Sequence, residues 1–274
     1  MRKVTIGAVQ MQCANNMEEN LNKAEMLVRE AAGKGANIIL LPELFQFPYF
    51  CQERRYEYYS YATPTNENPA VRHFSKLAKE IGVVLPISFY EKDGNQLYNS
   101  IAVIDADGSI LGVYRKIHIP DDHFYQEKFY FKPGDHGFRV WETAFGKIGI
   151  GICWDQWFPE TARSLALNGA EILFFPTAIG SEPILECDSM LHWRRCMQGH
   201  AAANILPVVA SNRIGLETVV PCKENAGQSS ELLFYGSSFI TDDTGEIICS
   251  AGRKEETVIC ATIDLDEMAE NRLN

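Results

Sequence analysis

The sequence predicts an α/β fold in which two β-sheets pack face to face and carry helices on their outer faces. Apolar, β-branched runs alternate with amphipathic segments along most of the 274 residues. In addition, "GANIILLPE" (35–43) and "GAEILFFPT" (169–177) share one form, in which Gly-Ala precedes a buried strand and a proline. This echo indicates two related halves, although two unrelated helix–strand joints would look alike.

The first half is expected to alternate strands and helices. Asn16 followed by Glu19 resembles a helix start, and apolar residues then recur at helical spacing until "GKG". Asn68-Pro69 opens a second helix with one apolar face. The strands expected around these helices are "KVTIGAVQ" (3–10), "NIILLPE" (37–43) and "VVLPISF" (83–89).

Hairpins are expected to interrupt this alternation, because "KDGN" and "DADG" are turn signals between strand-like runs. No linker or low-complexity tract interrupts residues 1–274, so we expect one domain with two sheets. The expected elements that follow are strands at 147–153, 171–176, 206–211, 237–242, 246–251 and 257–265, with helices at 158–168 and near 190–203.

Charge and composition exclude several function classes. The net charge is -11 and the pI is near 5.1, without a basic run, which argues against a nucleic-acid or anionic-membrane partner. This acidity suits a cationic ligand, although solubility alone accounts for it in most acidic proteins. The start "MRKVTIGAVQ" is typical of a strand and not of a signal peptide, and no apolar stretch approaches membrane-spanning length.

The eight cysteines show no CxxC pair, and the six histidines show no metal-ligand spacing. In a chain of this size the pattern favours reduced thiols in the cytoplasm over a disulfide framework or a zinc site. We therefore expect no metal and no cofactor.

Three ionisable residues follow apolar strands: Glu43 after "NIILLP", Lys116 after "SILGVYR" and Cys153 after "KIGIGI". Ligands gather at the carboxyl ends of strands in α/β sheets, so these groups could converge on one pocket. A thiol with a pKa near about 8.5 needs a base, which a carboxylate can supply, and an ammonium can stabilise an oxyanion. Taken singly, such residues are more often packing or solvated charges, and the spacing alone leaves the two interpretations about even.

Three segments resemble the signature segments of the nitrilase superfamily of carbon–nitrogen hydrolases: "LPELF", "YRKIHIP" and "GICWDQWFPE". The resemblance implies a four-layer αββα sandwich and a Glu-Lys-Cys triad. It makes Glu43 the general base, Lys116 the group that stabilises the tetrahedral intermediate, and Cys153 the nucleophile. It also implies that the Trp154 backbone N–H completes the oxyanion hole, and that Glu127 in "YQEKFYF" positions substrate or water.

The residues after Cys153 indicate the substrate class. Members of the family that hydrolyse N-carbamoyl amino acids tend to carry paired arginines three and four positions after the cysteine, where this chain has Gln156 and Trp157. The change leaves an aromatic wall beside Asp155 and Glu160, and such a wall suits a cationic substrate.

The segments "CWDQWFPE", "PTAIGSEP" and "HWRRCMQGHAAAN" resemble a branch of the family that removes the ureido group of a carbamoylated diamine, releasing the diamine, carbon dioxide and ammonia. We therefore expect a small cationic ureido substrate. Glu182 is the expected partner of its distal ammonium, with Tyr49 and Trp154 along the methylene chain. Glu182 could equally be an exposed loop charge, and Arg194 and Arg195 could form a carboxylate site or surface ion pairs.

Several alternatives stay open. The same triad would serve an ω-amidase, an aliphatic amidase or a β-ureidopropionase-type hydrolase, and a scaffold protein could keep the fold without activity. The family resemblance implies a homodimer or a higher homo-oligomer. The chain stops at "DEMAENRLN", within an expected helix, where related chains usually continue. We therefore expect a short C-terminal tail, and the higher assembly stays open.

Overall fold

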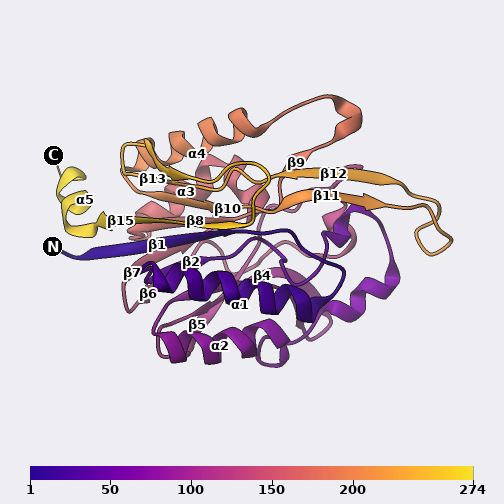
Figure 1. Ribbon diagram of the computed structural model, residues 1–274, viewed down its shortest axis with the longest axis horizontal. Coiled ribbons are helices and arrows are strands. Elements are labelled where there is room, and N and C mark those ends of the chain that lie inside the picture. Colours follow the sequence, from indigo (N-terminus) through magenta and orange to yellow (C-terminus); the bar gives the residue numbers. More distant parts are fainter. Residues whose placement is uncertain (274) are drawn as a thin grey trace.

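The computed structural model describes residues 1–273 and contains two layers of β-sheet between two pairs of helices (Figure 1). Helices α1 and α2 cover one outer face, and α3 and α4 cover the other. This is the predicted α/β fold with mixed sheets flanked by helices. The α-helices are α1 (Met17–Gly33), α2 (Pro69–Ile81), α3 (Pro159–Leu167), α4 (Met190–Asn204) and α5 (Leu265–Asn271).

The layer beside α1 and α2 consists of two three-stranded sheets, in the orders β15-β1-β2 and β3-β4-β5. They join edge to edge, because Ile39 N donates to Val84 O at 3.0 Å and Val84 N donates to Asn37 O at 2.8 Å. Strand β1 is parallel to β2 and antiparallel to β15. These strands are β1 (Lys3–Gln10), β2 (Ile38–Leu40), β3 (Leu85–Asp93), β4 (Gln96–Ile104), β5 (Ile110–Arg115) and β15 (Thr257–Asp264).

The layer beside α3 and α4 is one six-stranded sheet within the described residues, in the order β14-β13-β10-β8-β7-β6. Its central strands β7, β8 and β10 are parallel, as expected where helices connect successive strands. These strands are β6 (Val140–Thr143), β7 (Gly146–Ile150), β8 (Ile172–Pro176), β10 (Val208–Ser211), β13 (Phe239–Thr241) and β14 (Ile247–Ser250).

The two echoed segments occupy equivalent positions in the two layers. Alternate side chains of a strand point to opposite faces, and both faces of β2 and β8 are buried. One set packs between the sheets and the other beneath the helices. Burying each large apolar side chain stabilises the fold by about 1.5–3 kcal/mol. The inter-sheet residues are Ile38, Leu40, Ile172 and Phe174, and the helix-facing residues are Ile39, Leu41, Leu173 and Phe175.

The predicted helix starts are confirmed. The Asn16 side chain accepts from Glu19 N at 3.2 Å, and the Asn68 side chain caps α2 through the N–H groups of Ala70 and Val71. The two predicted turns join β3 to β4 and β4 to β5, and Gly94 in the first has φ +56°, which glycine adopts without strain.

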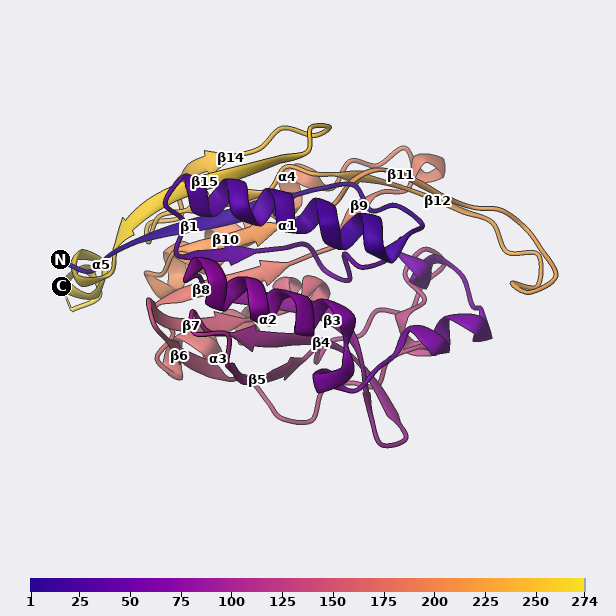
Figure 2. The same ribbon diagram turned by 60° about the horizontal axis from the view of Figure 1, so that its bottom comes forward.

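Strand β6 and the long hairpin of β11 (Ile214–Val219) and β12 (Ser230–Tyr235) are not among the predicted elements. The hairpin projects beyond the layers (Figures 1 and 2), and β12 pairs with the short strand β9 (Gly180–Ser181), which leads into Glu182. The described residues also form short 3₁₀ helices: η1 (Phe50–Gln52), η2 (Tyr56–Tyr61), η3 (Thr65–Glu67), η4 (Glu127–Phe129), η5 (Cys153–Trp157) and η6 (Pro183–Leu185).

Candidate active site

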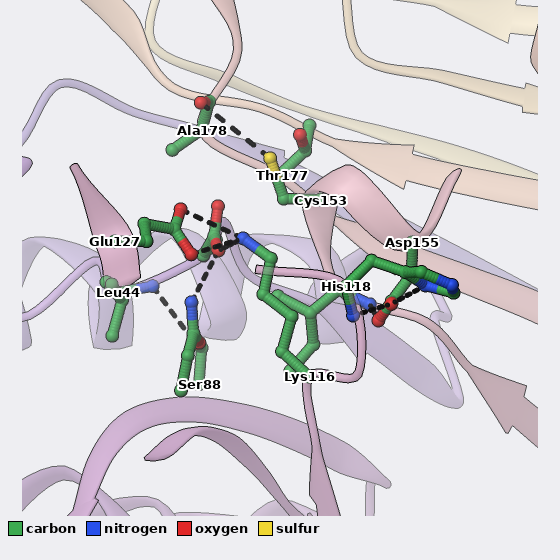
Figure 3. Close-up of polar contacts among 12 residues, drawn as sticks. Leu44, Ser88, Lys116, His118, Glu127, Cys153, Asp155, Thr177 and Ala178 are labelled. Carbon is green, nitrogen blue, oxygen red and sulfur yellow. Dashed lines mark hydrogen bonds and ion pairs between the residues drawn. The ribbon is translucent and has the colours of Figure 1, made fainter. Parts of the chain in front are cut away.

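Lys116 lies within a buried cluster of charges (Figure 3). It follows β5, and its ammonium donates to Glu127 Oε1 at 2.9 Å, to Glu127 Oε2 at 2.7 Å and to Glu43 Oε1 at 2.9 Å. All three side chains are fully buried. Residues that are 73 and 11 positions from Lys116 in the chain therefore share one ammonium group.

The Glu43 carboxylate has one bonded oxygen and one free oxygen. Oε1 accepts from Asn99 Nδ2 at 2.6 Å as well as from Lys116, whereas Oε2 is buried and has no hydrogen-bond partner among residues 1–273. Asn99 also accepts from Lys116 N at 2.9 Å through its backbone carbonyl. Asn99 thus holds both charged residues and leaves Glu43 Oε2 able to accept a proton.

Cys153 begins η5, just beyond the end of β7, and has φ +44°. Non-glycine residues rarely adopt this left-handed conformation, and it is often found at functional sites. The buried sulfur lies 3.9 Å from the backbone oxygen of Ala178, and Thr177 is adjacent (Figure 3). The turn therefore presents the thiol toward the end of β8.

The charges of the cluster act on one another. Burial raises the pKa of the Cys153 thiol well above its ordinary value, Glu43 adds to this rise and Lys116 opposes it. The thiol is therefore protonated at neutral pH and needs a base. Burial alone would lower the pKa of Lys116, but the attraction of Glu127 and Glu43 raises it well above its ordinary value. Burial raises the pKa of Glu127 to about 7, against the opposing pull of Lys116.

The turn that carries Glu43 is also strained and is held from behind. Leu44 has φ +48°, and its N–H donates to Ser88 Oγ at 2.9 Å (Figure 3). The fully buried Arg213 donates to the backbone oxygens of Glu43, Leu44 and Phe47 at 2.5 to 3.1 Å. The guanidinium thus satisfies carbonyls that no strand partner reaches.

Tyr49, which was predicted to line the substrate chain, holds Glu127. Its hydroxyl donates to Glu127 Oε1 at 2.5 Å, and its ring packs edge to face with Tyr125 and Phe234. Tyr49 is only 1% exposed, so the hydroxyl serves the charged cluster.

Trp154 and Glu182 lie nearer the surface than the charged cluster. Trp154 is 38% exposed and packs edge to face with Phe158 at 5.4 Å. Glu182 is partly buried after β9, and this burial raises its pKa. Burial raises the pKa of the Tyr125 hydroxyl, and the charges of Glu182 and Cys153 add to this rise.

The prediction that the Asp155 carboxylate lies beside the aromatic wall is wrong. Asp155 is fully buried and folds back within η5, where it accepts hydrogen bonds from Tyr114, His118 and Ile152 N. Gln156 is also fully buried and accepts from Trp193 Nε1 at 2.8 Å. Because a 3₁₀ turn directs these side chains inward, spacing after the cysteine alone does not show which of them face a substrate.

Arg194 and Arg195 differ in their surroundings. Arg195 is exposed, whereas Arg194 is half-buried, donates to Ser237 O at 2.9 Å and lies over the ring of Phe239 at 5.6 Å. Burial lowers the pKa of Arg194, and the charge of Arg253 lowers it further.

Two supporting residues, Asn99 and Arg213, were missing from the sequence-based prediction. Each is a polar or charged side chain directly within or beside an apolar strand, in "YNSIAVI" and "VVASNRI". Buried polar groups need partners, so such positions are the sequence signal that could have identified them.

Residues 1–273 contain no group of three or more His, Cys, Asp or Glu side chains that could hold a metal ion. Among the same residues, no helix has the length and apolar character needed to span a bilayer.

A four-layer α/β fold with a buried carboxylate, ammonium and thiol just beyond strand ends is the arrangement expected of a hydrolase of carbon–nitrogen bonds. The family model for carbon–nitrogen hydrolases matches residues 5–272. The chain belongs to the carbon–nitrogen hydrolase family, which confirms the resemblance to the nitrilase superfamily.

Curated relatives and solved structures match nearly the whole chain. An N-carbamoylputrescine amidase of Solanum tuberosum is 55% identical over 272 residues, which cover 99% of this chain and 89% of the relative. A citrullinase of Francisella tularensis is 52% identical over 273 residues, covering 99% and 93%. A crystal structure of a carbon–nitrogen hydrolase from Helicobacter pylori G27 has a TM-score of 0.90 at 38% identity, covering 99% of this chain and 92% of that chain.

Proposed function

We propose that this protein hydrolyses N-carbamoylputrescine to putrescine, carbon dioxide and ammonia, as a step in putrescine formation. The observation that carries the proposal is the free Oε2 of Glu43 in a buried cluster with Lys116 and a protonated Cys153. The similarity to the potato N-carbamoylputrescine amidase supports the choice of substrate.

The reaction begins when Cys153 attacks the ureido carbonyl and its proton passes to Glu43 Oε2. The ammonium of Lys116 and the backbone N–H of Trp154 stabilise the oxyanion of the tetrahedral intermediate. Glu43 then gives its proton to the departing nitrogen, so ammonia leaves and a thiocarbamate joins the sulfur to the carbonyl carbon.

Water completes the cycle. Glu43 takes a proton from the water as its oxygen attacks the thiocarbamate, and the sulfur recovers a proton as the C–S bond breaks. The released N-substituted carbamic acid loses carbon dioxide and yields the diamine. Glu127, held by Tyr49 and Lys116, positions the substrate or the attacking water.

The far end of the substrate carries an ammonium. Glu182 is the carboxylate that we assign to it. This residue is partly buried, and its charge and that of Cys153 both contribute to the raised pKa of the Tyr125 hydroxyl. The exposed ring of Trp154 lines the methylene chain beside the thiol, whereas Tyr49 acts through Glu127.

Citrulline is a second candidate substrate, because the citrullinase of Francisella tularensis is 52% identical to this chain. It carries a ureido group, an ammonium and, in addition, a carboxylate. Arg194 is the basic group that favours this candidate, since it is half-buried and its Nε has no hydrogen-bond partner among the described residues.

A substrate panel separates these functions. We expect ammonia release to give the highest kcat/KM with N-carbamoylputrescine, and Glu182→Gln to raise KM for it about 10-fold or more with little change in kcat, since a ground-state contact to a charge is lost. Higher kcat/KM for citrulline would favour the second candidate. Higher kcat/KM for N-carbamoyl-β-alanine or an ω-amide, or no turnover of any of these compounds, would contradict the proposal.

Assembly and compartment remain expectations of the same proposal. We expect a homodimer or a larger homo-oligomer, which light scattering after size-exclusion chromatography would measure. We expect the protein to work in the cytoplasm, where its eight cysteines, all free in the structure, would stay reduced.

A further inference from the structure

Asp155 is a fully buried carboxylate that has no part in the chemistry proposed above. Its Oδ1 accepts from His118 N at 3.0 Å and from His118 Nδ1 at 2.7 Å. Its Oδ2 accepts from Tyr114 Oη at 2.8 Å and from Ile152 N at 2.9 Å. Both oxygens thus carry two hydrogen bonds, which is enough to stabilise a buried charge.

These four hydrogen bonds connect the two segments that carry Lys116 and Cys153. Tyr114 and His118 stand two residues before and two residues after Lys116, and Ile152 directly precedes Cys153. Figure 3 shows the pair of His118 and Asp155 beside the backbone of both segments. A single carboxylate therefore links the backbone segments that carry the ammonium and the thiol.

The same carboxylate closes the strained turn at the thiol. Asp155 N donates to Ile152 O at 3.0 Å while Asp155 Oδ2 accepts from Ile152 N, so the turn is bonded in both directions around Cys153. A left-handed conformation at a non-glycine residue costs on the order of 1–3 kcal/mol and persists only where its surroundings enforce it. The turn also sets the direction of the Trp154 N–H.

His118 is fixed on its other side. Its ring stacks on Phe158 with centroids 3.6 Å apart and planes at 8°. Because Asp155 Oδ1 accepts this hydrogen bond, Nδ1 carries the proton. The ring therefore connects Asp155 and Phe158 to the segment that follows Lys116.

We propose that Asp155, through His118 and Tyr114, is a positioning residue that sets the geometry between Cys153 and Lys116 for carbon–nitrogen bond hydrolysis. The inference rests on the roles proposed above for these two groups. Displacing a reacting group by about 1 Å can cost on the order of 10²-fold in rate without weakening substrate binding.

The test compares Asp155→Asn, His118→Leu, His118→Asn and Tyr114→Phe with the wild type. Asp155→Asn and His118→Leu should lower kcat about 10²-fold and change KM by less than about threefold. His118→Asn puts an amide N–H where Nδ1 stands, so it should recover most of the activity lost in His118→Leu. Tyr114→Phe removes one bond and should lower kcat about 3- to 10-fold. His136→Leu, an exposed histidine outside the cluster, is the matched control.

Two further measurements make the result decisive. Circular dichroism gives the folded fraction, and peptide mass spectrometry gives the rate at which iodoacetamide alkylates Cys153, without any ureido substrate. The inference is overturned if folded Asp155→Asn keeps both kcat and the alkylation rate within threefold of the wild type. It is also overturned if lost activity follows the unfolded fraction and His118→Asn recovers none. If the wild type alkylates at Cys153 but releases no ammonia, the proposed function fails, and the alkylation rates alone decide the inference.

Discussion

The turn that carries Glu43 and the turn that carries Cys153 are both strained, and each is held by a buried side chain of opposite charge. Each follows a buried strand of a different sheet layer, and each contains a non-glycine residue with positive φ, Leu44 at +48° and Cys153 at +44°. The Glu43 turn is held by the guanidinium of Arg213, which donates to backbone oxygens. The Cys153 turn is held by the carboxylate of Asp155, which accepts from backbone N–H groups.

The difference follows from which backbone groups each turn leaves without a partner. Buried carbonyls need donors, and a guanidinium supplies five in a fixed plane. Buried N–H groups need acceptors, and a carboxylate offers about four positions. At this site the side chains that satisfy the buried backbone groups, Arg213 and Asp155, therefore also hold the turns that orient Glu43 and Cys153.

The largest expected effects separate each turn from the reactive group that it carries. Cys153→Ser and Glu43→Gln should each lower kcat on the order of 10³- to 10⁴-fold or more. The serine hydroxyl is a weaker nucleophile than the thiol, and the glutamine amide cannot accept the proton. Both turns keep their Arg213 and Asp155 bonds, so the melting temperature should change little. Steady-state ammonia release and thermal unfolding measure the two quantities, and a wild-type rate in either variant would end the proposed mechanism.

Removing the guanidinium breaks the first turn itself. Arg213→Met leaves Glu217, whose Oε1 accepts from Arg213 Nη1 at 3.2 Å, buried without its charge partner. It also removes the guanidinium's hydrogen bonds to the backbone oxygens of the turn. We expect the free energy of unfolding to fall by about 3–5 kcal/mol in urea denaturation. Adding Glu217→Gln should restore part of the loss, and a fall below about 1 kcal/mol in the single variant would argue against the comparison.

A smaller effect is expected from Asn99, which orients the reactive side chain on the first turn. Asn99→Leu removes the 2.6 Å bond to Glu43 Oε1 and lets the carboxylate rotate. A hydrogen bond to a charge contributes about 1.5–3 kcal/mol, so kcat should fall about 10- to 10²-fold. The exposed Asn95→Leu in the neighbouring turn is a control, and an unchanged kcat in Asn99→Leu would mean that Lys116 alone orients Glu43.

The outline of the fold was predictable because burial on two faces leaves a plain pattern. Runs such as "NIILLP" and "EILFFP" have no polar face, and only strands covered by a sheet and by helices tolerate that. The β11–β12 hairpin was not predicted, since its exposed strands mix polar and apolar residues and project from the layers.

The positions of Glu43, Lys116 and Cys153 could be predicted from strand ends and from the family resemblance. Their support could not be predicted, because the partners of a buried polar group come from distant segments. Arg213 reaches Glu43 across 170 residues, and no local pattern encodes that contact. Asp155 was misjudged for the same reason, since its direction depends on a 3₁₀ turn and on Tyr114 and His118.

The smallest predicted effect concerns Glu127, which meets Lys116 between the two turns. Its pKa is raised by burial from the ordinary 4.5 to about 7, so between these values the folded protein holds a proton that the unfolded chain has lost. Stability from this group is therefore present below pH 4.5 and is lost as the pH rises toward 7. Relative to Glu127→Gln, the wild-type free energy of unfolding should fall between pH 5 and 8, by less than about 3 kcal/mol. Urea denaturation of both proteins across this range measures the difference, and a wild type that gains stability relative to the variant would mean that Lys116 outweighs burial at this carboxylate.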